Sequence, residues 1–176
     1  QPVSIVLAKG DTARLTVSAS PRKLTPAGIP WDRDVLVALL DGAKREIVAQ
    51  ALGYGPTSRG ETDSTLDHAL RRAAARGVKV RLIFSDWSGD DDIAALKGLA
   101  AVPGIEVRIS RVPDWSGGYV PFGRVEHCKF AVADGARAWI GTSNWEPGYF
   151  STLRNVALTI ENARLAGQVL RTFDTS

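Results

Sequence analysis

The sequence contains no methionine, a single cysteine and only two histidines. Because one cysteine cannot form an intrachain disulfide, the redox compartment stays open. No apolar run approaches the roughly 20 residues that a helix needs to cross a bilayer, so no transmembrane segment is expected. Nothing at the N-terminus resembles a signal peptide. A chain that begins at Gln1 and lacks methionine is expected to be a processed product or a fragment, without its targeting region.

The composition is that of an ordinary globular protein, with 44% apolar and 23% charged residues among 176. This length fits one domain with a substantial core. The net charge of +3 permits an anionic substrate but is too small to require nucleic acid. We therefore expect a single domain over residues 1–176, either soluble or peripheral to a membrane, in a compartment that the sequence does not identify.

Apolar periodicity predicts the secondary structure of most of the chain. It indicates strands over 13–19, 46–52, 78–84, 105–109, 125–133, 136–143 and 154–160. It indicates helices over 32–44, 62–76, 91–101 and 163–173, with Asp32 able to cap the first. Three successive strand–helix–strand passages favour a parallel sheet. The predicted fold class is α/β, with a mixed, largely parallel sheet flanked by helices on both faces.

Residues 124–145, RVEHCKFAVADGARAWIGTSNW, have the pattern of a β-hairpin. The first arm alternates in polarity, and Asp134-Gly135 is a strong signal for a two-residue turn. A two-residue loop places His127 opposite Thr142, and a loop longer by one residue on each side places it opposite Asn144. Both registers predict the same parity, because a slip by two residues keeps the face.

The predicted shared face carries an imidazole, an ammonium, a hydroxyl and a carboxamide, from His127, Lys129, Thr142 and Asn144. The cation and the donors suit phosphoryl oxygens, and an imidazole nitrogen attacks phosphorus or carries a proton. The alternative for His127 is a core histidine, but a buried ammonium beside it is costly without an anion. Asp134 lies roughly 20 Å from His127 along an extended strand, so we expect it to stabilise the turn.

The pattern His127-x-Lys129-x-x-x-x-Asp134, followed by GTSN at 141–144, resembles the HKD motif of the phospholipase D superfamily. The residues IGTSNW, followed by YF, are most similar to the second motif of one group in that superfamily. This group contains lysosomal 5′ exonucleases and poxvirus envelope phospholipase-like proteins. The resemblance extends back to about Ser18. It implies one phospholipase D-like domain, the C-terminal half of a two-motif protein.

The resemblance implies a phosphodiesterase or phosphatidyl transferase that forms a phosphohistidine intermediate without a cofactor or a metal. His127 would be the nucleophile or the general acid, and the acid if this is the C-terminal half. Lys129 and Asn144 would hold the phosphoryl oxygens, and Asp134 is the remaining member of the motif. The expected substrate-binding residues are Thr142, Ser143, Trp145 and Arg124.

Members of the superfamily use two histidines, one from each of two motifs, whereas this chain has one such motif. Its other histidine, His68, falls on the polar side of a predicted helix and is interpreted as a surface residue. The second motif is therefore expected from the missing half of a longer polypeptide, which we favour, or from a homodimer mate. The rival from another class is a binding or scaffold half without catalytic activity.

Phospholipid is the first expectation for the substrate, because the breadth of the superfamily favours hydrolysis or exchange of a phospholipid headgroup. The residues around GTSNW favour the end of a single-stranded nucleic acid as the substrate instead. Aromatic residues on or beside predicted loops would stack bases, pack acyl chains or belong to the core: Tyr54, Trp87, Trp115, Trp145 and Tyr149.

Further polar residues have two interpretations each. Asn155 lies where relatives often carry an acidic residue that supports the histidine, or it simply begins a strand. Glu146 is another candidate supporter. Residues 90–92, three aspartates, are interpreted as the acidic start of a helix rather than as a metal site. Arg111 and Arg124 flank the hairpin and would add positive potential for a phosphodiester or remain solvated.

Overall fold

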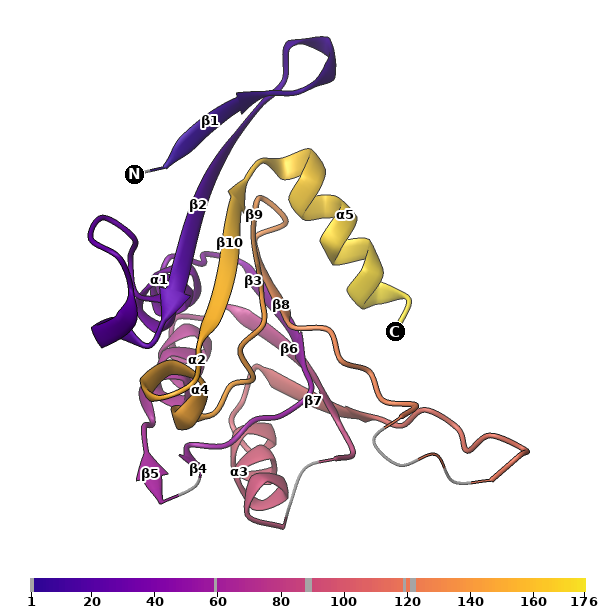
Figure 1. Cartoon of the computed structure of the whole chain (residues 1–176). Helices are drawn as coiled ribbons and strands as arrows, with labels where there is room; N and C mark the ends of the chain where they lie inside the picture. The colour runs from indigo at the N-terminus through magenta and orange to yellow at the C-terminus, as the bar shows by residue number, and fades with distance from the viewer. Residues whose placement is uncertain (1, 59, 88–89, 119, 121–122) are drawn as a thin grey trace.

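The computed structural model describes residues 2–58, 60–87, 90–118, 120 and 123–176. Within these residues, eight strands form one sheet in the order β1-β2-β10-β9-β8-β3-β6-β7 (Figure 1). They are β1 (Val3–Val6), β2 (Thr12–Ser20), β3 (Glu46–Ala51), β6 (Lys79–Ser85), β7 (Ile105–Ser110), β8 (Phe130–Ala133), β9 (Arg137–Gly141) and β10 (Asn155–Glu161). A separate short hairpin consists of β4 (Thr57–Ser58) and β5 (Glu61–Thr62).

The helices are α1 (Asp32–Asp41), α2 (Thr65–Ala75), α3 (Asp90–Ala100), α4 (Pro147–Ser151) and α5 (Ala163–Asp174), with 3₁₀ turns η1 (Ala8–Gly10) and η2 (Arg22–Leu24). Helices α1 and α2 pack on one face of the sheet and α5 packs on the other (Figure 1). The predicted α/β class, with helices on both faces of a mixed sheet, is confirmed. In the described part of the chain, every helix is too short or too polar to cross a membrane.

The sheet is mostly antiparallel, so the prediction of a largely parallel sheet is wrong. Among the described strands, β3 with β6 and β6 with β7 pair in parallel, and the other five neighbouring pairs are antiparallel. The passage β2–α1–β3 does not join neighbours, because β10, β9 and β8 lie between its strands. These three strands come last in the chain, and apolar periodicity does not show where they enter the sheet.

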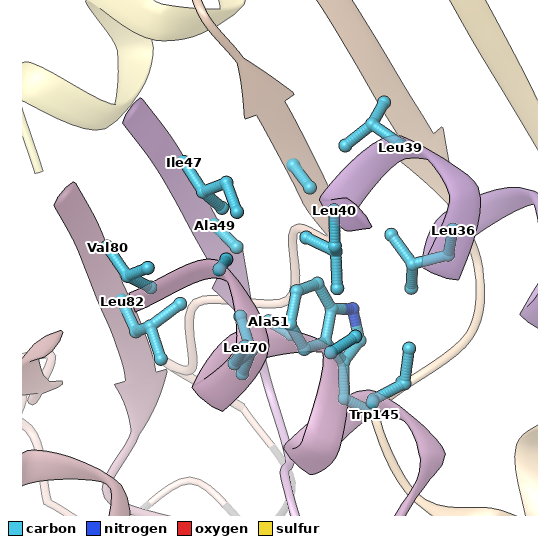
Figure 2. Packing of buried hydrophobic residues seen from close by; sticks show 14 of the residues in the cluster. Leu36, Leu39, Leu40, Ile47, Ala49, Ala51, Leu70, Val80, Leu82 and Trp145 are labelled. Atoms are coloured by element: carbon cyan, nitrogen blue, oxygen red, sulfur yellow. The ribbon is translucent and has the colours of Figure 1, made fainter. Parts of the chain in front are cut away.

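The larger part of the core lies between the sheet and helices α1 and α2. Apolar side chains meet there around Trp145: Leu36, Leu39, Leu40, Ile47, Ala49, Ala51, Leu70, Val80 and Leu82 (Figure 2). The intervening residues of β3 and β6 point to the other face, where Val48 and Ile83 pack under α5. This alternation explains why both strands are almost continuously apolar in sequence, since both of their faces are buried.

The sheet face under α5 continues beyond that helix as an exposed apolar surface. Cross-strand register aligns Val3 with Leu15, Val17 with Leu158, and Leu158 with Ile140. We call these residues, together with Val156, the open apolar face. Val17 and Val156 are 52% and 58% exposed. A contiguous apolar surface of this kind generally marks an interaction site.

One edge of the sheet collects strand ends from distant parts of the sequence. Strands β3, β6 and β7 end there, and β8 begins there because it runs antiparallel to β3. The end of β9, the start of β10 and the end of β2 lie at the same edge. Since ligands of open α/β sheets bind beyond the carboxyl ends of the parallel strands, this edge is where a site is expected.

Candidate functional site

The hairpin predicted from the sequence forms, but its register differs from the prediction. Ala133 pairs with Arg137, so the loop contains three residues, Asp134 to Ala136, rather than two or four. Asp134 and Gly135 both have positive φ angles, of 58° and 65°, and Ala136 is the additional loop residue. With two or four loop residues, odd-numbered residues of one arm would pair with even-numbered residues of the other. With three loop residues, odd-numbered residues pair with odd-numbered ones.

The prediction that strand pairing puts His127 and Lys129 on one face with Thr142 and Asn144 is therefore wrong. Regular pairing is also shorter than expected, since residues 123–129 lie outside any strand and β9 ends at Gly141. Gly141 N donates to Lys129 O at 3.0 Å. Beyond this hydrogen bond, loop geometry rather than strand alternation determines where the four side chains lie.

Lys129 and Asn144 are both buried, and each has Glu146 as a neighbour. Lys129 Nζ donates to His127 O at 2.9 Å. Asn144 Nδ2 and the carboxylate of Glu146 lie against Gly53, where a Cβ atom would approach Nδ2 to 3.3 Å and collide with the carboxylate. Glu146 also interacts electrostatically with Lys129. The site thus contains a buried ammonium, a buried carboxamide and a half-buried carboxylate.

Burial affects both the protonation of Lys129 and the hydrogen bonding of Asn144. Burial lowers the pKa of Lys129, and the nearby Cys128 and Glu146 oppose that shift. Asn144 Oδ1 is buried and has no hydrogen-bond partner among the described residues. An incompletely compensated ammonium and an unpaired amide oxygen each reduce stability, and such groups concentrate at functional sites.

His127 lies at the surface beside this buried group. Its side chain is exposed and lines an open hollow with Cys128, Phe130, Ile140 and residues of α5. The hollow borders the open apolar face, because Ile140 belongs to both. The imidazole is therefore accessible both to a substrate and to a second protein surface.

Thr142 and Asn155 are bonded to each other. Thr142 Oγ1 donates to Asn155 Oδ1 at 2.8 Å, and Asn155 Nδ2 donates to Tyr149 O at 2.8 Å. Together with Arg154, both residues line a hollow between the ends of β2, β9 and β10. Of the two interpretations of Asn155, the structure favours the beginning of a strand, since β10 starts at this residue.

Ser143 and Trp145 were predicted to bind substrate, but both are buried below the site. Ser143 Oγ donates to Asp32 Oδ2 at 2.9 Å. Trp145 lies in the core (Figure 2), and its backbone N–H donates to Gly53 O at 3.0 Å. Consecutive residues are buried here because the chain has left the strand conformation. We therefore assign Ser143 and Trp145 a structural role in place of the predicted contact with substrate.

Asp32 does not cap its helix, as the sequence suggested, but points into the core. The N-cap of α1 is Trp31, one position earlier. The carboxylate of Asp32 accepts hydrogen bonds from Ser18 Oγ at 2.8 Å, Trp139 Nε1 at 2.8 Å and Ser143 Oγ at 2.9 Å. Burial raises the pKa of Asp32 against the effect of these three donors. In the sequence, this residue resembles any acid in the first turn of a helix, so no signal distinguishes it.

The remaining candidates divide between surface and core. Arg124 is exposed, and its Nε and Nη2 donate to Pro113 O at 3.0 Å and 2.8 Å. Of the aromatic residues, Tyr54 is buried, whereas Trp87 and Trp115 are exposed. Helix α3 begins at the first of the three aspartates, one residue before the predicted start at residue 91, and the side chains of residues 90 and 91 lie outside the described part of the structure.

Asp134, the last residue of the HKD pattern, fastens the hairpin to the connection between α1 and β3. Its carboxylate accepts backbone hydrogen bonds from Lys44 at 3.0 Å, Arg45 at 2.7 Å and Glu46 at 3.1 Å. Burial raises the pKa of Asp134, but these backbone donors and the charge of Arg45 outweigh it, so the pKa is lowered. Asp134 therefore has a structural role, as the sequence predicted.

We expect Asp134→Ala to lower the free energy of unfolding by about 1–3 kcal/mol, because three backbone donors lose a charged acceptor. The folded pKa of Asp134 is below the unfolded one. Its contribution is therefore present above about pH 4 and is lost as the pH falls through the folded value. Urea unfolding at about pH 7 and about pH 3 should show a smaller difference between variant and wild type at the lower pH. Equal differences at both pH values would contradict this account.

The geometry of this sheet edge can be set beside known proteins. The family model described as "Cardiolipin synthase, PLD-like domain" matches residues 36–176. The chain belongs to this family. The predicted resemblance to the phospholipase D superfamily is thereby confirmed, and the HKD hairpin lies within the matched part.

Relatives of this PLD-like domain carry two kinds of name. The "5'-3' exonuclease PLD4" of Mus musculus is 37% identical over 156 residues, covering 81% of this chain and 31% of that protein. "Phospholipase D Z" of Dictyostelium discoideum is 32% identical over 179 residues, covering 97% of this chain and 42% of that protein. The PLD-like chain therefore spans between about a third and two fifths of these relatives.

Two solved structures have the same fold. Nuc from Salmonella typhimurium, described as a phospholipase D family member, superimposes with a TM-score of 0.71 at 22% identity and covers 93% of both chains. NucT from Helicobacter pylori also has a TM-score of 0.71, at 15% identity, and covers 92% of this chain and 94% of that one. At these identities the comparison establishes the PLD-like fold and nothing about substrate.

Proposed function

We propose that this chain is one catalytic half of a PLD-type phosphodiesterase in which His127 is the reacting imidazole. One observation carries the proposal: His127 is accessible, and its carbonyl oxygen accepts a hydrogen bond from the buried ammonium of Lys129 at 2.9 Å. A phosphodiester held at His127 would bring a negative charge close to that ammonium. The attraction between the two would offset the unfavourable burial of Lys129.

The proposed reaction has two steps that need two imidazoles. One imidazole nitrogen attacks phosphorus, and the bond from phosphorus to the leaving oxygen breaks while the second imidazole gives that oxygen a proton. The second imidazole then takes a proton from water, which attacks the phosphohistidine and releases the first histidine. In a C-terminal half, His127 is the second imidazole. Lys129 and Asn144 hold the phosphoryl oxygens on which charge develops.

The second imidazole comes, in this proposal, from another PLD-like half that docks on the open apolar face. Two features support this surface. It leaves Val17 and Val156 more than half exposed, and it adjoins the hollow that contains His127. A partner that covers the apolar side chains would also place its own groups opposite the imidazole. The partner is the other half of a longer polypeptide or a second copy of this chain.

We propose the end of a nucleic acid strand as the substrate. The support is the 37% identity to a relative named as a 5'-3' exonuclease. Phospholipid, the first expectation from the sequence, is the second candidate, because "Phospholipase D Z" aligns with 97% of the chain at 32% identity. Hydrolysis of a phosphodiester is common to both candidates.

The purified chain tests the homodimeric form of the site directly. We expect it to form dimers by light scattering and to hydrolyse bis(p-nitrophenyl) phosphate, with or without a chelator. Val17→Asp should shift the mass toward the monomer and lower turnover in step, because it buries a charge in the proposed interface.

Val6→Asp is the matched control, since Val6 is exposed on the other face of β1. This variant should dimerise and turn over substrate as the wild type does. A strictly monomeric wild type without turnover would refute the homodimeric site. Activity that appears only after addition of a separately expressed second half would then assign that half as the partner.

A further inference from the structure

Another hollow lies at the same edge of the sheet, beyond the ends of β6 and β7. It encloses about 110 Å³. We call it the tryptophan hollow and define it by six of its lining residues: Asp86, Trp87, Arg111, Asp114, Trp115 and Arg124. The hollow is close to the proposed reaction centre, because Arg124 precedes His127 by three residues and their Cα atoms are at most about 11 Å apart.

The two tryptophans of this hollow are unusually exposed for their size. Trp87 is 48% exposed and Trp115 is 54% exposed. The ring of Trp115 lies against the loop backbone at Gly117, where a Cβ atom would come within 2.6 Å of three ring atoms. The chain thus holds a large apolar ring in place while leaving half of it in solvent. A ligand that covers these rings gains the free energy of removing their surface from water.

The charges around the tryptophan hollow balance and leave it without a net preference for an anion. Arg111 pairs with Asp86 at 3.7 Å and with Asp114 at 3.6 Å. Both ion pairs are long and exposed, so they contribute little and their groups stay available to other partners. Two arginines and two aspartates are unsuitable neighbours for an acyl chain. A flat ring with its own donors and acceptors matches both the aromatic surfaces and the polar rim.

We propose that the tryptophan hollow is a stacking subsite for a nucleobase of the strand whose phosphodiester lies at His127. This inference rests on the proposed function and deepens it, because it selects nucleic acid over phospholipid from residues outside the HKD motif. Trp115 and Trp87 stack on the base or contact its edge. Arg124, which lines the same hollow, precedes His127 by three residues in the sequence. Since every base has a π face, the subsite tolerates all of them.

Binding measured by fluorescence anisotropy tests the subsite independently of catalysis. The probes are a 3′-labelled oligothymidylate and an abasic strand of equal length. We expect Trp115→Ala to weaken binding of the oligothymidylate between about fivefold and about 100-fold, the range found for stacked bases. Affinity for the abasic strand should stay as in the wild type. Trp115→Phe, which keeps a ring, should restore most of the loss.

Several outcomes would overturn the inference. Unchanged affinity for the oligothymidylate, an equal loss on both strands, or failure of the wild type to bind either strand would each do so. If Trp115→Ala lost binding to phosphatidylglycerol vesicles but kept its affinity for both strands, the hollow would be assigned to lipid instead. Turnover of bis(p-nitrophenyl) phosphate by the same wild-type sample separates the two proposals. Turnover without base-dependent binding contradicts the subsite only. Base-dependent binding without turnover, both for the chain alone and after addition of a separately expressed second half, contradicts the proposed chemistry.

Discussion

His127→Ala is expected to lower the turnover of bis(p-nitrophenyl) phosphate by at least about a thousandfold. In the proposed reaction the imidazole either forms the bond to phosphorus or protonates the leaving oxygen, and alanine can do neither. In the same proposed reaction, Lys129 and Asn144 stabilise charge and supply no nucleophile. The measurement is the initial rate of the purified variant in the assembly that is active as wild type.

Loss of activity should not come with loss of folding, because the side chain of His127 is exposed. The unfolding midpoint of His127→Ala should therefore match that of the wild type. His68→Ala is the matched control, since this histidine is exposed on α2 and contributes nothing to the site. Retention of more than about a tenth of wild-type turnover in His127→Ala would remove this residue from the reaction.

Asp32→Ala is expected to lower the free energy of unfolding by about 3 kcal/mol or more, because each buried donor left without a partner is costly. The substitution removes the acceptor of Ser18, Trp139 and Ser143 together. These residues belong to β2, β9 and the loop that leads to Asn144, so three segments lose their common link to α1. Urea unfolding at neutral pH measures the effect.

Asp34→Ala is the control for this substitution. Asp34 lies in the same first turn of α1, but its side chain is 55% exposed and pairs only with neighbouring Arg33, at 3.4 Å, within the described residues. It should change stability by less than about 0.5 kcal/mol, as exposed positions usually do. Similar losses in both variants would show that the charge at the start of the helix matters and the buried network does not.

The pH dependence of Asp32 provides a second test with the opposite sign to that of Asp134. Burial raises the folded pKa of Asp32 above its ordinary value of 3.8. Its protonated form is therefore favoured by folding, and this contribution is full below the unfolded pKa and lost as the pH rises through the folded one. The stability of wild type relative to Asp32→Asn should fall over that interval. A constant difference would contradict the raised pKa.

The sequence predicts the elements of this fold well, because each has a clear apolar period. β3 and β6 are continuous apolar runs, and α2 and α5 bury one stripe each. The sequence does not predict the order of the strands in the sheet, since β8, β9 and β10 lie between β2 and β3, which precede them in the sequence. That insertion makes the sheet mostly antiparallel, and only contacts between distant residues determine it.

For the candidate site, the sequence names the residues but does not determine their geometry. Lys129 and Asn144 are both buried and share Glu146 as a neighbour, but the strand parity that the sequence predicts for them fails because the loop has three residues. Asp134-Gly135 is compatible with loops of several lengths, so sequence alone does not choose among them. Ser143 and Trp145 are misplaced for a related reason. Period-two reasoning does not apply once the chain has left β9.

The hydrogen bonds of Asp32 limit how far this domain can be truncated from its N-terminus. The family model begins at residue 36, and a shorter chain starting there would keep the complete HKD hairpin. It would lack the Asp32 carboxylate, which accepts hydrogen bonds from Ser143 and Trp139. Truncation at the boundary of sequence similarity would thus preserve the whole motif and remove the support beneath it. We therefore expect a stably folded minimal domain to begin before Asp32, early enough to include Ser18 of β2.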